Sequence, residues 1–239
     1  GVSQFEARPG VPDPVDAARL DAIIKAYDVR GLVPEQFDAD IARRIGAAMV
    51  DVLDIRQSRG GPGAVIIGQD MRPSGDDLVA AFAEGVCSQG CDVVLIGLAS
   101  TDGLYFASGA RGLPGAMFTA SHNPAAYNGI KLCRAGAAPV GQDSGLADIR
   151  RLVGQGVPVY DGPPGRVTRE DVLPDYASYL RGLVDLRTGR PLRVVIDAGN
   201  GMAGLTVPAV LGIETGEDAL PLEITPLYFE LDGTFPHHE

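Results

Sequence analysis

The sequence has no tryptophan and only three cysteines among its 239 residues. These thiols, Cys87, Cys91 and Cys133, cannot all be disulfide-bonded, and no two of them have the spacing of a metal-ligand pair. No apolar run approaches the roughly 18 residues of a membrane-spanning helix, and the N-terminal segment lacks the apolar core of a signal peptide. We therefore expect buried, reduced thiols, a cytoplasmic location and no contact with a membrane.

Basic residues are also scarce, since 20 lysines and arginines are outnumbered by 31 acidic residues, for a formal net charge of −11. Nucleic acids and anionic membrane surfaces repel a net anion, so the composition disfavours both as partners. A small anionic ligand is still compatible, because a local group of basic side chains holds phosphate even in an acidic protein. Hydrophobic residues make up 45% of the chain, which is enough for a packed core.

Apolar segments of strand length alternate with segments of helical spacing along the first part of the chain. The predicted strands span residues 22–27, 64–68, 92–96, 116–119 and 129–133, and the predicted helices span 38–53, 74–86, 101–109 and 143–153. Ser74 is the expected N-cap of its helix, with acidic residues in the first turn. Strands that are apolar on both faces and separated by helices favour an α/β sheet covered on both sides.

A stretch rich in proline and glycine, residues 154–169, precedes a second series of elements. We interpret it as a linker or a strand-bearing connection, which divides the chain into domains at 1–155 and 156–239. The second part predicts a helix at 171–186, a strand at 193–197, a helix at 202–211 and a strand at 222–228. The predicted fold is therefore two α/β domains with mixed, mostly parallel sheets sandwiched by helices, the second domain incomplete.

The segment with most chemical information runs from Thr119 through Ser121, His122 and Asn123 to Lys131. A serine at the end of a strand, beside polar side chains and with a lysine ten residues later, is a plausible nucleophile. Local chemistry alone favours a polar turn in which serine, asparagine and proline serve only the backbone. The G-x-S-x-G elbow of the α/β-hydrolases is absent.

The string TASHNPAAYNGIK at residues 119–131 resembles the active-site serine loop of the α-D-phosphohexomutases, the phosphomannomutase/phosphoglucomutase group. Four further strings are similar to motifs of this group and occur in the same order: KAYDVRG at 25–31, GQDMRPS at 68–74, VIDAGNGMAG at 195–204 and DGTFPHHE at 232–239. On these five matches the chain is identified as a member of that family, and the resemblance covers about the first half of a family member.

The resemblance implies an enzyme that interconverts hexose 1-phosphate and hexose 6-phosphate of mannose, glucose or both. Ser121 would carry a phosphoryl group and pass it to the substrate through a 1,6-bisphosphate intermediate. Arg30 and Lys131 would stabilise the phosphate or the transition state, with Lys131 a candidate proton carrier. His122 is assigned to catalysis and to substrate binding, and Tyr27 and Asn123 to substrate binding. Arg72 and Ser74 are interpreted as structural residues that support the loop.

In the family, Mg²⁺ is held by the serine phosphate and by three aspartates of a D-G-D-G-D-R loop. This string is absent from the sequence, so only Ser121 matches that metal site. The resemblance also implies glucose or mannose 1,6-bisphosphate as activator. The expected partners are a hexose phosphate and the missing C-terminal half, with domains III and IV, and we expect the present chain to be inactive alone.

Three alternatives stay open at this point. A phosphoglucosamine mutase has the same fold, but the AYDVRG and AAYNGIK strings are closer to the mannose and glucose group. A second alternative is a non-catalytic module that binds sugar phosphates. The third is a serine hydrolase built on Ser121 and His122, which the missing elbow disfavours.

Overall fold

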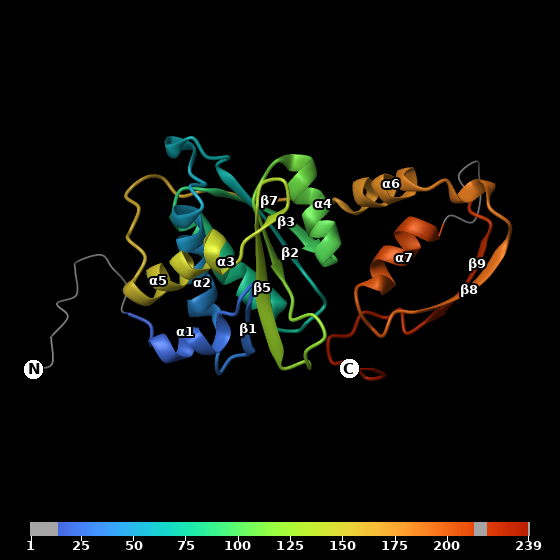
Figure 1. Cartoon of the computed structure of the whole chain (residues 1–239), viewed down its shortest axis with the longest axis horizontal. Helices are drawn as coiled ribbons and strands as arrows, with labels where there is room; N and C mark the ends of the chain where they lie inside the picture. Colours follow the sequence, from blue (N-terminus) through green and yellow to red (C-terminus); the bar gives the residue numbers. More distant parts are fainter. Residues whose placement is uncertain (1–13, 213–218, 239) are drawn as a thin grey trace, which may run out of the picture.

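The computed structural model describes residues 14–212 and 219–238. Two α/β units follow one another along the long axis of the molecule; the first is coloured blue through green to yellow and the second orange to red (Figure 1). Most of the segment used to exclude a signal peptide, and Glu239 of the closing DGTFPHHE string, lie outside the described residues.

A mixed sheet forms the centre of the first unit. Its strands are β1 (Val29–Leu32), β2 (Ala64–Gln69), β3 (Asp92–Leu98), β4 (Gly115–Phe118), β5 (Tyr127–Arg134), β6 (Ala138–Pro139) and β7 (Val167–Arg169). The order across the sheet is β1-β5-β4-β2-β3-β7, and β6 pairs with β5. β2 runs parallel to β3 and β4, whereas β5 is antiparallel to both β1 and β4. The α/β fold class predicted from the sequence is thereby confirmed.

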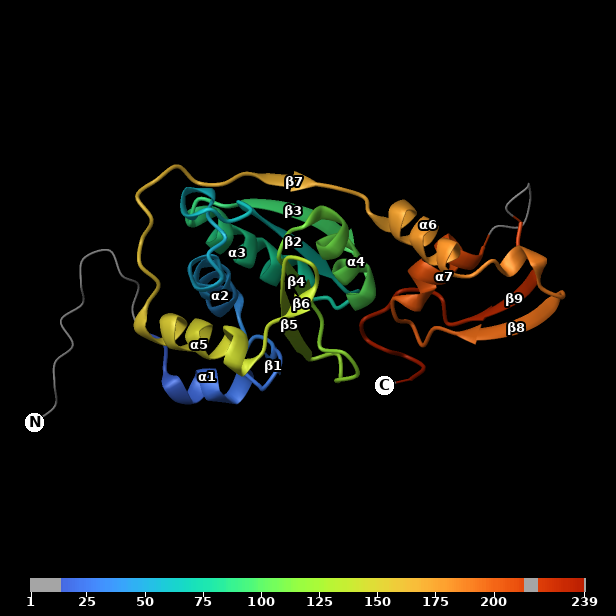
Figure 2. The same cartoon turned by 45° about the horizontal axis from the view of Figure 1, so that its top comes forward.

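Helices cover both faces of this sheet, as Figure 2 shows. They are α1 (Ala17–Ile23), α2 (Ala39–Val52), α3 (Gly75–Ser88), α4 (Thr101–Arg111) and α5 (Leu146–Gln155), with the 3-10 turns η1 (Gln57–Arg59) and η2 (Gln142–Ser144). Val65 and Ile67 of β2 point into the core beneath α1, α2, α3 and α5, and Ile66 points into the core beneath α4. Successive side chains of a strand alternate between faces, so this apolar strand supplies both cores.

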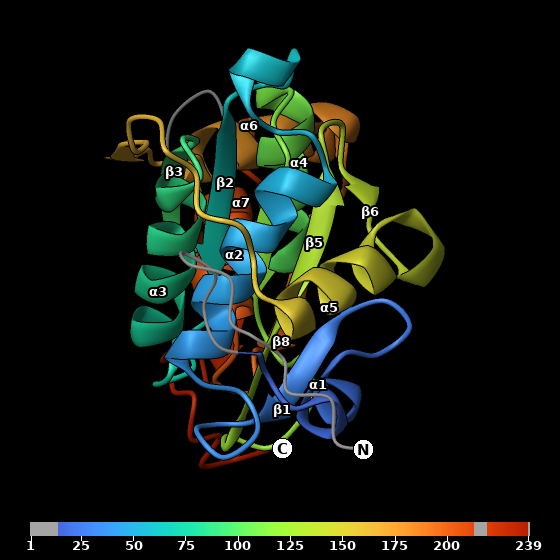
Figure 3. The ribbon, with the colours of Figure 1, turned by 90° about the vertical axis from the view of Figure 1, so that its left-hand side faces the viewer.

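Two glycines let α2 and α3 approach each other closely; the helices lie side by side in Figure 3. A Cβ atom on Gly46 would lie 2.3 Å from the carbonyl oxygen of Phe82, and one on Gly85 would lie 2.0 Å from that of Arg43. Both distances are far below van der Waals contact, so any larger residue would force the helices apart.

The first predicted strand, residues 22–27, is wrong. Helix α1 runs to Ile23, and Ile24 forms only an isolated bridge with Val29. The Asp16 carboxylate caps the helix by accepting from the N–H of Ala18, and Leu20 and Ile23 are buried in the core. The apolar run is therefore the inner face of a short helix and not a strand.

Ser74 occupies the N-cap position of α3, but its side chain makes no capping hydrogen bond. Its hydroxyl instead accepts from the Asn128 side-chain amide at 3.0 Å. The predicted position of Ser74 is right and its predicted capping interaction is wrong, because the hydroxyl links the start of α3 to β5.

The second unit consists of α6 (Leu173–Leu183), the turn η3 (Leu186–Thr188), β8 (Leu192–Asp197), α7 (Ala203–Leu211) and β9 (Leu222–Leu227). β8 and β9 form a parallel pair. No residue of β8, β9 or α7 is buried, and Val195 is 66% exposed. Two strands and two helices do not enclose a core here, so apolar surface of this unit is uncovered.

Strand β7 belongs to the stretch predicted as a linker or strand-bearing connection, and it pairs with β3 in the sheet of the first unit. The division of the chain at residue 155 stays a prediction. Across residues 14–212 and 219–238, no helix combines the length and apolar character that crossing a membrane requires.

The three cysteines are free thiols; Cys91 and Cys133 are buried and Cys87 is half-buried. Burial raises the pKa of all three, that of Cys91 to about 11, and the carboxylate of Asp92 adds to the shift at Cys87 and Cys91. The reactive thiolate of Cys91 is therefore a minor species at neutral pH.

We expect Cys91 to resist alkylation in the native protein. With a pKa of about 11, its thiolate fraction at pH 8 is on the order of 10⁻³. Iodoacetamide treatment at pH 8 followed by peptide mass spectrometry should leave Cys91 unmodified, whereas in urea all three thiols should react. Rapid labelling of Cys91 in the folded protein would contradict this prediction.

Candidate functional site

An open cleft of about 390 Å³ lies where β2, β3 and β4 end. Its lining residues from the first unit are Asp70, Met71, Ala99, Ser100, Thr101, Met117, Thr119 and Ser121, and those from the second unit are Ala198, Gly199, Gly201, Met202, Phe235 and His238. The carboxyl ends of neighbouring parallel strands are where α/β sheets bind ligands. The cleft therefore has both the position and the polar lining of a binding site.

Ser121 follows β4 at this edge, and its backbone is in the left-handed region with a φ of 56°. Its N–H donates to the Thr119 hydroxyl at 3.0 Å, and that hydroxyl donates to the Asp70 carboxylate at 2.7 Å. A non-glycine residue in this conformation is held there by its surroundings at some cost in energy. The result is an exposed Oγ on a backbone that the neighbouring strand fixes.

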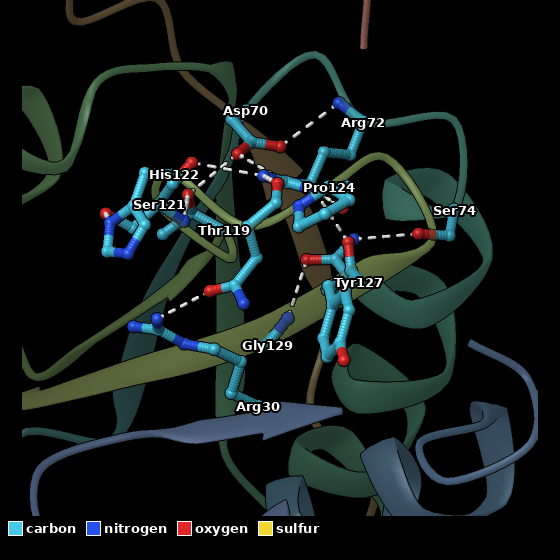
Figure 4. A network of polar contacts seen from close by, with 12 residues as sticks. Arg30, Asp70, Arg72, Ser74, Thr119, Ser121, His122, Pro124, Tyr127 and Gly129 are labelled. Atoms are coloured by element: carbon cyan, nitrogen blue, oxygen red, sulfur yellow. Dashed lines mark hydrogen bonds and ion pairs between the residues drawn. The ribbon is translucent and has the colours of Figure 1, made fainter. Parts of the chain in front are cut away.

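Arg72 holds the whole serine loop (Figure 4). Its guanidinium donates to four backbone carbonyl groups, those of Ser121, Asn123, Pro124 and Tyr127, at 2.7–3.0 Å. Its Nε lies 3.3 Å from Asp70, and its side chain is 0% exposed. Burial lowers the pKa of Arg72 and the Asp70 carboxylate opposes this shift, so the guanidinium stays charged. These contacts agree with the structural role predicted for Arg72.

Arg30 and Lys131 share one carboxylate. The Oδ2 atom of Asp28 lies 2.5 Å from Nη2 of Arg30 and 3.2 Å from Nζ of Lys131. Nη1 of Arg30 also donates to the side-chain oxygen of Asn123 at 2.7 Å. Among the described residues, the buried Nε of Arg30 has no partner. The structure thus brings Arg30, Lys131 and Asn123 together beside the serine loop, with two cations oriented by one acid.

The other two predicted residues are placed differently. His122 is exposed, and its Nδ1 is 3.4 Å from Oγ of Ser121. Tyr27 is 79% exposed and does not line the cleft, so its role in substrate binding stays a prediction. Within residues 14–212 and 219–238, His122 makes no contact with a carboxylate, so the orienting acid of a hydrolase triad is absent there.

A family model described as "Phosphoglucomutase/phosphomannomutase, alpha/beta/alpha domain I" matches residues 21–156. The chain belongs to the phosphoglucomutase/phosphomannomutase family. The match spans the whole segment that presents Asp28, Arg30, Arg72, Ser121 and Lys131.

Relatives with curated names support this membership. A phosphomannomutase of Escherichia coli is 39% identical over 217 residues, and proteins of Xanthomonas campestris named phosphohexose mutases are 37% identical over 214. A crystal structure of a phosphoglucomutase/phosphomannomutase family protein from Burkholderia thailandensis gives a TM-score of 0.77 at 32% identity, covering 94% of this chain and 47% of that one. Each curated match covers 89% of this chain but only 46% or 45% of the relative, so the chain spans about half their length.

The second unit supplies the opposite side of the cleft. The Asp197 carboxylate accepts from the N–H of Gly199 at 2.9 Å and lies 2.8 Å from Nε2 of His238. These two contacts lower the pKa of Asp197, the Gly199 N–H most strongly. An anion is therefore fixed at the tip of β8, where it orients His238.

Sequence reasoning missed four residues that organise the site. Asp28 lies within the KAYDVRG string. Its contact with Arg30 could have been predicted only from their spacing, because residues two apart in an extended segment point to the same side. Asp70 and Thr119 were likewise unassigned. Asn200, within the VIDAGNGMAG string, was also unassigned; it is buried, with a φ of 61°, and its N–H donates to the Tyr228 carbonyl.

The predicted Mg²⁺ site needs several oxygen ligands close to Ser121. In the part of the chain that the structure describes, no three His, Cys, Asp or Glu side chains form a group suited to a metal ion. Ser121, once phosphorylated, would supply oxygen ligands, but the described residues do not complete the six-fold coordination that Mg²⁺ prefers. These residues alone do not fit the metal.

Proposed function

We propose that this chain supplies the phosphoryl-carrying half of a hexose-phosphate mutase acting on mannose and glucose phosphates. One observation carries the proposal: the exposed Oγ of Ser121 is held over the cleft by four carbonyl contacts to buried Arg72. Membership of the family and relatives named phosphomannomutase support the substrate class. Phosphoryl transfer depends mainly on positioning and on charge stabilisation, which suits such a rigid loop.

The proposed reaction has two transfers. Phosphoserine 121 gives its PO₃ group to a free hydroxyl of the hexose monophosphate; the bond to Oγ breaks, and the hydroxyl proton passes to a base. The resulting 1,6-bisphosphate reorients in the cleft, so that its other phosphate faces Ser121. Oγ of Ser121, protonated after the first transfer, then attacks the other phosphoryl group; the bond from that phosphorus to the sugar oxygen breaks, this oxygen takes up the Oγ proton, and the phosphoserine is regenerated as the isomeric monophosphate leaves. Free glucose or mannose 1,6-bisphosphate would load unmodified Ser121 by the second transfer and thereby act as activator.

Three side chains next to the loop have assigned roles. Lys131, paired with Asp28, is the candidate proton carrier, since an ammonium held by a carboxylate exchanges a proton with a nearby hydroxyl. Arg30 stabilises the charge on the transferring group, because its guanidinium presents several donors to phosphate oxygens. His122 lies next to Oγ and contacts the phosphate, while Asn123 orients Arg30 and the substrate.

The proposal includes a polypeptide partner, the counterpart of the second half of the longer relatives. The uncovered apolar residues of β8, α7 and β9 support it, because a parallel sheet is stable only when both faces are covered. That half would also have to supply the aspartate ligands for Mg²⁺, whose role is to neutralise phosphate charge. The chain by itself is accordingly expected to show no turnover.

The decisive experiment measures phosphate on Ser121. This chain, combined with its second half, is incubated with Mg²⁺ and α-D-glucose 1,6-bisphosphate, and the intact mass of this chain is recorded before and after. We expect one added phosphoryl group, which tandem mass spectrometry assigns to Ser121 and which Ser121→Ala does not acquire. Absence of phosphate before and after incubation, or phosphate on a different residue, would refute the proposal.

Replacing Lys131 should separate rate from stability. We expect Lys131→Gln to slow turnover of the assembled enzyme, meaning this chain with its second half, by about 10²-fold, because one cation or proton carrier is lost from the transition state. The side chain is partly exposed, so the free energy of unfolding should change little. Steady-state kinetics and urea unfolding measure both, with Arg150→Gln, a surface ion-pair residue, as control. A large loss of stability at unchanged rate would make Lys131 structural.

A further inference from the structure

The loop at residues 232–238 of the second unit lies directly against the turn that carries Arg72. Gly233 is buried, and a Cβ atom there would lie 2.6 Å from the carbonyl oxygen of Met71 and 2.7 Å from Cα of Arg72. The backbone of Gly233 is outside the left-handed region, so its own conformation accepts alanine. Glycine is needed here because two backbones of different units touch.

Phe235 of the same loop covers the guanidinium of Arg72. Its ring centroid lies 5.2 Å from Cζ of Arg72, within the range of a cation–π contact. The backbone of Phe235 has a φ of 51°, which is rare and costly for an aromatic residue. The loop therefore adopts a strained conformation at the residue whose ring meets Arg72.

Two polar residues keep this loop in place. The Asp232 carboxylate accepts from the N–H and the hydroxyl of Thr234 at 2.9 and 2.7 Å, and these contacts lower its pKa. The carbonyl of Asn200 accepts from the N–H of Asp232 at 3.0 Å, and its side-chain amide donates to Glu230 at 3.0 Å. The position of Phe235 is therefore fixed to the turn after β8.

We propose that Gly233 and Phe235 are positioning residues for phosphoryl transfer at Ser121. They act through Arg72, whose four hydrogen bonds fix the serine loop (Figure 4). The ring shields the guanidinium from water, and hydrogen bonds of a shielded charge are stronger. Seating of the second unit thus rigidifies the loop of the first. The assignment rests on the proposed function only in naming Ser121 as the phosphoryl carrier.

Hydrogen exchange tests, without any reaction, whether the contact of Gly233 with the Arg72 turn rigidifies the serine loop. In Gly233→Ala, amides of residues 120–127 should exchange about tenfold faster, as expected when one methyl group is forced into a closed contact. Peptides from α2 serve as the internal reference and should not change. Gly182→Ala in α6 is the matched control, since a Cβ there meets no atom within 4 Å. Unchanged exchange of residues 120–127 in Gly233→Ala would overturn the inference.

Phosphate uptake by Ser121 from glucose 1,6-bisphosphate tests the chemical part. Phe235→Leu should slow uptake by about threefold to fivefold, the size expected for one lost cation–π contact at a partly exposed site. Phe235→Tyr keeps the ring and should restore the wild-type rate, which a purely apolar packing role would not require. Equal rates for Phe235→Leu and wild type would contradict the inference. If wild type takes up no phosphate, the proposed function fails, while hydrogen exchange still decides whether the loop is positioned in this way.

Discussion

Ser121→Ala is expected to abolish turnover of the assembled enzyme, with a fall on the order of 10⁶ in kcat, the size seen when a covalent nucleophile is removed. The reason is chemical: in the proposed reaction Oγ carries the phosphoryl group, and alanine has no oxygen to replace it. Ser178→Ala is the matched control, since Ser178 is exposed on α6 and makes no contact with the cleft. Turnover of Ser121→Ala within a hundredfold of wild type would contradict the assignment.

The free energy of unfolding should respond differently from turnover to substitutions of Ser121. Ser121 is exposed, and among the described residues its Oγ has one side-chain partner, His122 at 3.4 Å, so Ser121→Ala should change the free energy of unfolding by no more than about 0.5 kcal/mol. Ser121→Gly should be equally inactive and more stable by about 0.5–1 kcal/mol, because glycine adopts a φ of 56° without steric cost. Urea unfolding measures both variants, and a less stable Ser121→Gly would show that the left-handed backbone is not strained.

Much of the first unit follows from short-range patterns. The apolar residues 64–68 predicted a strand buried on both faces, and β2 supplies both cores. The spacing of Ile41, Ile45 and Met49 predicted a helix with one buried stripe, and all three are buried in α2. Such elements are predictable because the periodicity of burial is written directly in the order of residues.

Elements whose burial depends on distant segments were not predictable in this way. Residues 22–27 have the composition of a strand, yet Asp16 caps a helix there and its inner face packs on the core. Glycine inside a helix is expected to destabilise it, but Gly46 permits the close approach of α2 and α3. In both cases the deciding contact is tertiary, and the local sequence does not contain it.

The site shows the same division. The motif around Ser121 predicts a nucleophile at the end of a strand, and the structure places Ser121 just after β4. The carbonyl contacts of Arg72 were not predictable, because backbone acceptors leave no trace in residue identity. Gly233 and Phe235 contact the turn that carries Arg72 from more than one hundred residues away, across two units. Their contribution became visible only from the packing of the units.

Arg72→Leu is expected to lower the free energy of unfolding by about 3–5 kcal/mol, the cost of breaking a buried ion pair by removing one partner. The side chain is wholly buried, so its loss leaves the Asp70 carboxylate without its cation and takes a donor from four carbonyl groups, of which that of Pro124 keeps the Tyr127 N–H. Urea unfolding followed by circular dichroism measures the change. Arg43→Leu, which breaks an exposed pair with Glu84, is the control and should cost no more than about 1 kcal/mol.

The double variant Asp70→Asn with Arg72→Leu separates the two causes. Neutralising residue 70 removes the unpaired charge but not the orphaned carbonyl groups, so we expect it to recover part of the lost stability and none of the phosphate uptake at Ser121. Arg72→Lys should resemble Arg72→Leu in phosphate uptake, because one ammonium group does not span carbonyls that a planar guanidinium reaches together. If Arg72→Lys takes up phosphate at the wild-type rate, a positive charge alone is sufficient at this position. In that case the forked geometry of Arg72 would not be what presents Ser121 to the cleft.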